Sequence, residues 1–356
     1  MENMSKNCPL CGSPIKDGHY KCKKCGADLS AGGNAATGQL SRGELTAITD
    51  AIRKKKKIFG WLAIVSLVLI PIFVIVFGEE GGSVLAVADL VVFFTFYSLW
   101  ISRMDLIKKI IKTSFAGEIR KMLANMFELE SYEPDGYFSP EQIRETRLKS
   151  YDKSRGTDLV SSGSDLVKGK YKGVPFAFCD LLLTEGLRGP GSDDDNTITR
   201  LKGQWIEFKL NRQIDSTLYV MERKYSKKKE YLNRPDEFGV IQEAFTDNDL
   251  FNKNFQIFTN DPQTMFYILT PHFMEYILTA DKAADSLSDF CFTGDRVRIA
   301  LANERDLFDL DIMGKDIAKS KDLDWVSDKF KSDLRFITDI FDALLKNEYL
   351  FGTEEK

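Results

Sequence analysis

The sequence predicts a chain of three parts: a small four-cysteine ribbon, a pair of membrane-crossing helices and an α+β domain. Three observations support this prediction. They are two pairs of closely spaced cysteines near the amino terminus, two long apolar runs between residues 58 and 101, and strand-like and helical patterns without regular alternation over residues 131–356. With 356 residues, 43% hydrophobic and 29% charged, the chain has a globular composition and room for about two domains.

Charge is distributed unevenly along the chain. Residues 1–57 carry 11 Lys and Arg against five Asp and Glu, whereas residues 103–356 carry 38 against 45. An acidic main body lacks the clustered cations from which most nucleic-acid affinity comes. Nucleic acid is therefore not expected as a partner, and only salt-dependent binding by the isolated ribbon would favour it.

Residues 1–28 are predicted to form a zinc ribbon. Two C-x-x-C-G pairs are separated by ten residues and supply four cysteines: Cys8, Cys11, Cys22 and Cys25. Four thiolates around one ion are typical of structural zinc, which leaves no open position for catalysis. Because a segment of this length cannot bury a useful core, metal binding should supply its folding free energy. A redox pair, two disulfides and a competing His19 are the alternatives.

Residues 29–57 are predicted to form a flexible linker followed by a basic juxtamembrane helix. The linker is rich in Gly, Ala, Ser and Asn and offers little to bury. Ser41 is a plausible helix cap for Glu44 at the third position. The helix ends in a run of five cations, Arg53 and Lys54 to Lys57, which should attract anionic membrane lipid.

Residues 58–77 and 84–101 are predicted to be transmembrane helices 1 and 2. The first run has twenty residues without a charge, about 30 Å of helix, which matches the hydrocarbon thickness of a bilayer. The turn between the runs has no Lys or Arg, whereas cations flank both outer ends. The positive-inside rule then places both termini in the cytoplasm of a bacterial inner membrane.

Asp89 is the one charge within the second apolar run. Its place five residues into this run predicts a position near the outer end, where the cost of burying a carboxylate falls. An ion or proton relay is the functional alternative to an acid tolerated at the interface.

An amphipathic helix over residues 103–130 and a cytoplasmic α+β domain over residues 131–356 are predicted next. Apolar residues at three- and four-residue intervals predict the helix, and similar periodicity predicts helices over 262–278 and 323–350. Strands are predicted over 174–183, 204–210, 217–223, 255–258, 289–292 and 297–302, with a hairpin turn at 293–296.

Residues for catalysis are scarce. The chain has two histidines, and no phosphate-loop, H-E-x-x-H or G-x-S-x-G motif. His272 is expected to be a local helix residue, and Cys179 and Cys291 are expected to be reduced and packed as small apolar groups. These features favour a binding protein over an enzyme.

The segment 251–278, F-N-K-N-F-Q-I-F-T-N-D-P-Q-T-M-F-Y-I-L-T-P-H-F-M-E-Y-I-L, resembles a bacterial family described as domain of unknown function 3137. Further similarity lies in residues 173–178 and 208–217, and in residues 299–300 followed by 306–308. Where the family tends to have Glu-Ala-Arg, this chain has Thr264, Met265 and Phe266. The resemblance implies a membrane anchor of two spans with a cytoplasmic domain. It also implies LemA-like membrane proteins as neighbours, and it supplies no catalytic residues.

Together these patterns predict an integral membrane protein that binds other proteins as an adaptor or sensor. The alternative is a membrane-proximal enzyme or small-ligand receptor, with a pocket in the carboxyl-terminal domain formed by non-contiguous carboxylates. A deep pocket holding acids with raised pKa would favour the alternative, and a flat apolar surface would favour the adaptor.

Overall fold

The computed structural model describes residues 8, 13, 22–25, 42–146, 148, 158–186, 197–223, 235–236, 239–309 and 324–352. Its contacts divide the chain into two compact units. The helical unit comprises Met1–Ile119 with Asp309–Ser327, and the sheet unit comprises Arg120–Phe308 with Asp328–Lys356. Each is described separately below.

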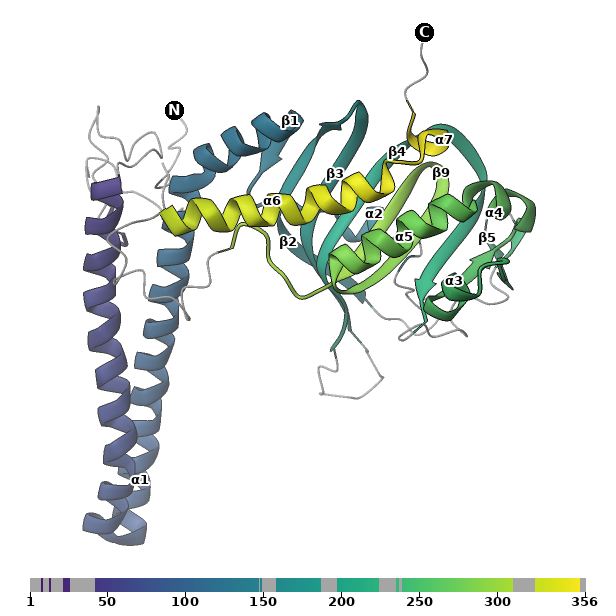
Figure 1. The fold of residues 1–356 in the computed structure, drawn as a ribbon. Coiled ribbons are helices and arrows are strands. Elements are labelled where there is room, and N and C mark those ends of the chain that lie inside the picture. Colours follow the sequence, from purple (N-terminus) through teal and green to yellow (C-terminus); the bar gives the residue numbers. More distant parts are fainter. Residues whose placement is uncertain are drawn as a thin grey trace, which may run out of the picture. The chain divides into compact units, whose positions relative to one another are not determined.

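The helical unit is built from one long helical element that doubles back on itself. Helix α1 (Arg42–Met126) is helical throughout its 85 residues. In a straight helix Ser66 and Asp89 would be about 35 Å apart, yet the Ser66 hydroxyl donates to Asp89 Oδ1 at 2.5 Å. The rings of Phe59 and Phe96 lie 6.4 Å apart. The element therefore reverses between Ser66 and Asp89, and its two arms lie side by side (Figure 1).

The structure changes two boundaries predicted for this region. The predicted turn between the apolar runs is assigned as helical, as part of α1. The predicted separate helix over 103–130 is the continuation of α1, which ends at Met126 before a strand begins at Glu128. Several apolar positions of this stretch are buried at intervals of four or five residues: Leu106, Ile110, Phe115, Ile119 and Leu123.

The sheet unit confirms the predicted α+β class. Its main sheet is antiparallel in every pairing and has the order β1-β2-β3-β4-β8-β7, with β9 paired to β4. The strands are β1 (Glu128–Glu133), β2 (Asp158–Tyr171), β3 (Val174–Gly186), β4 (Thr197–Glu222), β7 (Gln242–Ala244), β8 (Phe255–Thr259) and β9 (Leu287–Ala302). Strands β5 (Pro235–Asp236) and β6 (Gly239–Val240) form a separate pair.

Strand β4 joins the two ends of this sheet. Along one edge it pairs first with β3, up to Phe208, and then with β8, from Leu218 onwards. Along the other edge it pairs with β9 over both stretches. The two strands predicted over 204–210 and 217–223 are thus one. Ile214 between them is buried, and register shifts on either side of it keep the strand continuous across the polar stretch.

The predicted hairpin over residues 289–302 is wrong. Both halves belong to β9 and pair with the same strand, since Phe292 lies opposite Leu218 and Val297 opposite Phe208. Gly294 has a φ of 61° and lies opposite Ile214 between two register shifts. The glycine therefore supplies the left-handed residue of a bulge, not the corner of a turn.

The predicted helices are confirmed in place but each is interrupted. A break before Pro271 divides the predicted 262–278 helix, because proline cannot continue the hydrogen-bond ladder and Thr270 caps a new helix by accepting from Phe273 N. Asn347 likewise caps a short last helix. The helices are α2 (Pro140–Thr146), α3 (Asp249–Asn254), α4 (Pro262–Ile268), α5 (Pro271–Ala284), α6 (Asp324–Leu344) and α7 (Glu348–Phe351).

The sheet has a packed layer on each face. Figure 1 shows α5 and α6 in front of the sheet and α2 behind it. In front, Phe341 of α6 contacts Phe176 and Phe208 with ring centroids 5.1 and 4.6 Å apart. Behind, Ile143 of α2 belongs to a buried cluster with Trp205 of β4. The two faces therefore form separate cores around a shared sheet.

Replacing Phe341 by Ala should lower the free energy of unfolding of the sheet unit by about 3–5 kcal/mol. The ring is fully buried and touches aromatic side chains from three strands. Denaturant unfolding of the full chain in detergent, followed by near-ultraviolet circular dichroism, measures the loss. Phe266→Ala is the matched control, because its ring is 55% exposed and its loss should stay within about 0.5 kcal/mol. Equal losses in the two variants would contradict this assignment of the core.

Candidate functional site

Three of the four cysteines predicted to bind zinc lie together. Cys8, Cys22 and Cys25 are buried, and their sulfur atoms all lie within 4.8 Å of one another. The Cys8 and Cys25 sulfurs are 3.7 Å apart, too far for a disulfide of about 2 Å. Zn–S bonds of about 2.3 Å in a tetrahedron separate sulfurs by about 3.8 Å, so this spacing fits a shared zinc ion. Cys11 and His19 lie outside the described residues.

A backbone hydrogen bond joins Cys8 to Ser13. Cys8 N donates to Ser13 O at 2.8 Å.

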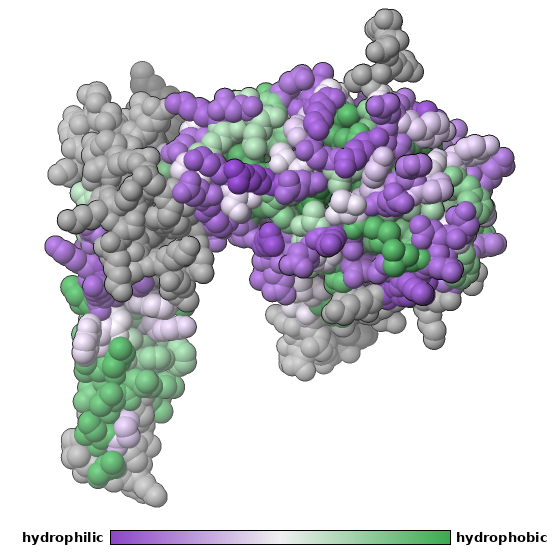
Figure 2. Space-filling view, viewed as in Figure 1, coloured by the Kyte–Doolittle hydropathy of each residue, from purple (hydrophilic) through white to green (hydrophobic). Residues whose placement is uncertain are grey.

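The α1 arms expose large apolar side chains instead of burying them. Trp61, Ile75 and Val87 are 69%, 81% and 64% exposed, and Figure 2 shows hydrophobic side chains gathered on this pair of arms. Within the described residues, the segment Val87–Ile107 is long and apolar enough to cross a membrane, with a mean hydropathy of 1.5. The predicted segment 58–77 includes residues whose side chains lie outside the described part.

Asp89 lies near the middle of the paired arms, not near the end expected from its place in the sequence. Lys56 lies over the Trp100 ring and Ser66 bonds Asp89. Ser66 is ten residues, about 15 Å, from Lys56 along one arm. The midpoint between Ser66 and Asp89 in the sequence is a further eleven residues or so away. The second Asp89 oxygen, Oδ2, is buried and bonds no described residue.

A hollow of about 560 Å³ opens on the sheet unit beside α2. It is lined by residues from five strands, β1, β2, β3, β4 and β9, and by the segment around α2. Its charged lining residues are four basic and three acidic side chains: Lys168, Lys209, Arg296, Arg298, Glu130, Glu145 and Glu207. This size is that of a small-molecule site.

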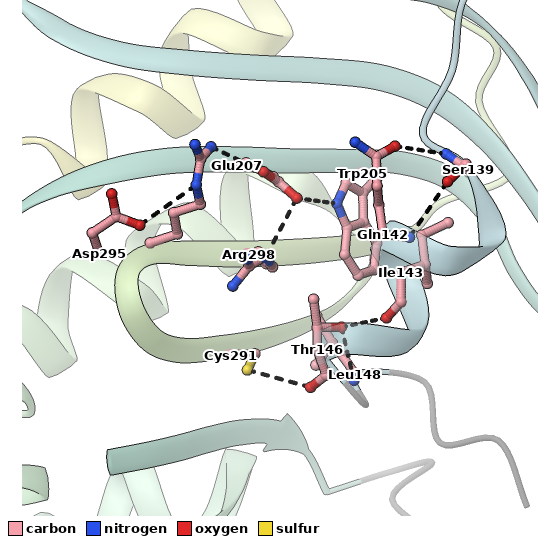
Figure 3. A network of polar contacts seen from close by, with 11 residues as sticks. Ser139, Gln142, Ile143, Thr146, Leu148, Trp205, Glu207, Cys291, Asp295 and Arg298 are labelled. Carbon is pink, nitrogen blue, oxygen red and sulfur yellow. Dashed lines mark hydrogen bonds and ion pairs between the residues drawn. The ribbon is translucent and has the colours of Figure 1, made fainter. Parts of the chain in front are cut away.

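Glu207 is the most buried of these charges, with 9% of its side chain exposed. Trp205 Nε1 donates to its Oε1 at 3.2 Å, and Arg298 Nε donates to the same oxygen at 3.3 Å (Figure 3). Arg296 Nη1 donates to Oε2 at 3.3 Å. A buried carboxylate needs such partners, because an unpaired charge in the interior is strongly unfavourable. Glu207 in turn fixes the positions of both guanidinium groups.

A second group of acids lies apart from the hollow. Carboxylate oxygens of Asp165, Asp180 and Asp306 lie within 4.8 Å of one another. Burial, followed by the nearby charges of Asp306 and Asp165, raises the pKa of Asp180 well above its usual value, against the lowering effect of its hydrogen bond from Gln204. Carboxylates this close favour sharing a proton.

Protein groups already bond both oxygens of Asp180. Gln204 Nε2 donates to Oδ1 at 2.8 Å and Leu307 N donates to Oδ2 at 2.6 Å. None of the three aspartates lines the hollow. The acids with raised pKa and the pocket, which we expected together in a ligand-binding domain, are thus in different places.

Other residues considered in the sequence have structural positions. His272 is exposed in the first turn of α5. Cys179 and Cys291 are fully buried in the core behind the sheet, as expected. Burial raises the pKa of the Cys179 thiol, which keeps it in the unreactive protonated form.

The residues that line the hollow were not predicted from the sequence. The sequence carries a weak pattern that could have indicated them. Arg296 and Arg298 alternate with apolar residues in β9, and Lys168 and Lys170 flank a glycine in β2. Charges at every second position place cations on one face of a strand. Only the sheet order shows that these two strands contribute to the same surface.

Replacing Asp306 by Asn should reduce the pH dependence of stability. A carboxyl whose pKa is raised on folding stabilises the native state fully below its unfolded value, and this contribution is lost as pH rises through the folded value. Removing the Asp306 charge lowers the pKa of Asp180, so the variant should lose less stability than wild type as the pH rises towards 7. Urea unfolding of the full chain between about pH 4 and 7 measures this difference.

The matched control is Glu304→Gln, which removes an exposed acid two residues away. It should leave the pH profile unchanged. A profile for Asp306→Asn that is parallel to that of wild type would show that the two carboxyls do not interact.

Comparisons with known proteins concern the carboxyl-terminal part of the chain. Residues 199–346 match the family model described as "Protein of unknown function (DUF3137)". No curated protein matches the chain. The crystal structure of the mycobacterial trehalose monomycolate transport factor A, TtfA, aligns with 65% of this chain and 96% of its own at 10% identity. Its TM-score of 0.31 supports no conclusion. The region from β4 to α6 is thus similar to the DUF3137 family.

Proposed function

We propose that this protein is a membrane-anchored adaptor or sensor that binds other proteins on the cytoplasmic side of a bacterial inner membrane. The observation that supports the proposal is the exposed apolar surface of the α1 arms. Monomeric soluble proteins rarely expose apolar patches of this extent, whereas lipid tails would cover such a surface without cost.

The dimensions of the arms agree with a membrane anchor. About 21 residues separate Lys56 from the point at which α1 reverses. This corresponds to about 32 Å of helix, which is close to the hydrocarbon thickness of a bilayer. Arg103 lies over the Phe59 ring at 5.9 Å, near the same level. Cations on aromatic rings suit the headgroup layer, and their excess at this end favours a cytoplasmic location for both termini.

The Ser66 and Asp89 contact makes this anchor feasible. In the proposed membrane the acid lies at mid-depth, where insertion of a charged side chain costs about 2.5–3.5 kcal/mol. Ser66 Oγ lies 2.5 Å from Asp89 Oδ1 and 3.0 Å from Asp89 O. A hydroxyl on the facing arm therefore replaces part of the hydration that the carboxyl would lose.

The wild-type chain should stay with membranes after an alkaline carbonate wash and should need detergent for extraction. Replacing Val91 and Phe94 by Lys should release it, because both side chains are more than half exposed and each lysine opposes insertion by about 3 kcal/mol. The measured quantity is the share of chain in the pellet after the wash. Val160→Lys, at a similarly exposed apolar position of the sheet unit, should leave that share unchanged.

Topology provides the second measurement. A carboxyl-terminal reporter that is active only in the reducing cytoplasm should be active. An exported tail would disprove the cytoplasmic orientation. Wild-type chain that is fully soluble without detergent would disprove the anchor.

The proposal includes one structural Zn²⁺ bound by Cys8, Cys11, Cys22 and Cys25. The support is the 3.7 Å sulfur spacing and the burial of the three described cysteines. A closed thiolate site of this kind holds a short segment in shape for binding and supplies no open position for catalysis. Candidate partners include LemA-like membrane proteins, in line with the family resemblance.

Changing Cys22 to Ser should lower bound zinc from one equivalent per chain to less than half and should abolish partner crosslinks that depend on the ribbon. The loss follows because three thiolates bind the ion far more weakly than four, and the ribbon folds only with metal. Metal analysis of purified chain and crosslinking in native membranes measure the two effects.

The control is Ser13→Ala, which keeps all four thiolates and the backbone hydrogen bond from Cys8 N. It should retain both zinc and crosslinks. Zinc-free wild-type protein would overturn the metal assignment, and unchanged crosslinks in zinc-free Cys22→Ser would overturn the role of the ribbon in partner binding.

A second candidate function is that of a small-ligand receptor. The hollow beside α2 favours it, because about 560 Å³ suits a small molecule and charged groups converge there from several strands.

A further inference from the structure

We infer that the hollow on the sheet unit binds a small organic anion, through a carboxylate or phosphate group held by Arg298 and Lys168. The inference rests on the receptor candidate above and is independent of the zinc site and the membrane anchor. The contacts around Glu207, the order of the strands and the charges of the lining residues support it.

The strand register brings the cations to one surface. Lys168 pairs with Ala177, Ala177 with Glu207, and Glu207 with Arg298. Cross-strand partners point to the same face, so these four side chains form one row across β2, β3, β4 and β9. With strands about 4.8 Å apart, the row places the two outer cations about 14 Å apart at their backbones. Their long side chains can reach one ligand between them.

The small side chain in the row leaves room for that ligand. Ala177 lies between the lysine strand and Glu207, and its methyl group fills little of the space above the sheet. In the neighbouring row, Lys209 pairs with Arg296. Both line the same hollow, so a second pair of cations borders it.

Glu207 acts as a positioning residue. It is buried and its two oxygens are occupied by donors from Trp205, Arg296 and Arg298. Its negative charge is thus already matched by two guanidinium groups, and it holds them toward the hollow with little freedom left. A fixed guanidinium binds an oxyanion with a smaller loss of side-chain entropy.

Donor capacity remains after these contacts. Arg298 uses Nε for Glu207, and its two terminal nitrogens bond none of the described residues. Lys168 is exposed and has no carboxylate within salt-bridge distance in the described part of the chain. Arginine forks match carboxylate and phosphate oxygens in geometry and charge. The remaining acids of the lining, Glu130 and Glu145, are exposed side chains.

The rest of the lining suits an organic group. Tyr137, Phe138, Leu166 and Pro175 offer aromatic and aliphatic surface. Tyr137 is 41% exposed, so its ring is available to a ligand. An inorganic anion would leave most of the hollow unfilled, which favours an anion attached to an apolar or aromatic body.

Titration calorimetry of the full chain in detergent tests the inference with five probes. Phenyl phosphate and benzoate are organic anions, inorganic phosphate lacks the organic body, benzyl alcohol lacks the charge, and benzylamine reverses it. Phenyl phosphate or benzoate should bind, at least tenfold more tightly than the other three probes. The probe that binds more tightly of these two shows whether the natural ligand carries a phosphate or a carboxylate group.

The lining variants should remove this preference. Arg298→Gln should weaken the preferred anion at least tenfold, and Lys168→Gln severalfold. Lys168 is exposed and has no ion pair in the described part of the chain, so its variant should fold even if Arg298→Gln does not. Lys253→Gln, an exposed lysine of α3 outside the hollow, is the control and should bind as wild type does.

Three results would overturn the inference. Equal anion affinity in wild type and Lys168→Gln would show binding elsewhere. Tighter binding of benzylamine or benzyl alcohol would leave the receptor candidate in place but exclude an anion site. Binding of no probe would reject both the inference and the receptor candidate.

Discussion

The sheet unit depends on the pairing of β4 along both of its edges. This strand of 26 residues carries β3 and then β8 on one side and β9 on the other, so it joins parts of the chain that would otherwise form separate ribbons. Because side chains alternate across a strand, β4 also supplies both cores: Phe208 packs against α6, and Trp205 packs in the cluster behind the sheet. The α6 layer and the α2 layer can form only when this strand is in register.

The same alternation separates two groups of polar residues. Gln204 donates a hydrogen bond to Asp180 in the acidic group. Three positions further along β4, Glu207 accepts hydrogen bonds from two arginines beside the hollow. In the acidic group three carboxylates lie close together, and Asp180 accepts from one side-chain amide and one backbone N–H. In the other group one carboxylate contacts two guanidinium groups. The first arrangement favours protons and structural rigidity, and the second leaves cationic groups available for an outside anion.

Local patterns predicted the elements whose causes are local. The strand from Val174, the β8 strand and the amphipathic part of α1 follow directly from residue spacing, and the α+β class follows from their irregular order. The predictions failed where a distant partner decided the outcome. Thr293 to Arg296 has the composition of a turn, but pairing with β4 on both sides converts its glycine into a bulge. The hollow was missed for the same reason, since Lys168 and Arg298 are 130 positions apart in the sequence and meet only through sheet order.

Glu207 and Asp89 illustrate how each unit compensates for a carboxylate in its own surroundings. Glu207 is held by two guanidinium groups and an indole N–H, so its charge can persist in the interior. Asp89 has a single hydroxyl on one oxygen, and no described residue bonds the other. A charged side chain at the middle of a bilayer is strongly unfavourable, so in the proposed anchor the Ser66 hydroxyl offsets only part of this cost. In the proposed anchor Asp89 therefore lies away from the interface that its place in the sequence suggested, and its contact with Ser66 links the two arms at mid-depth.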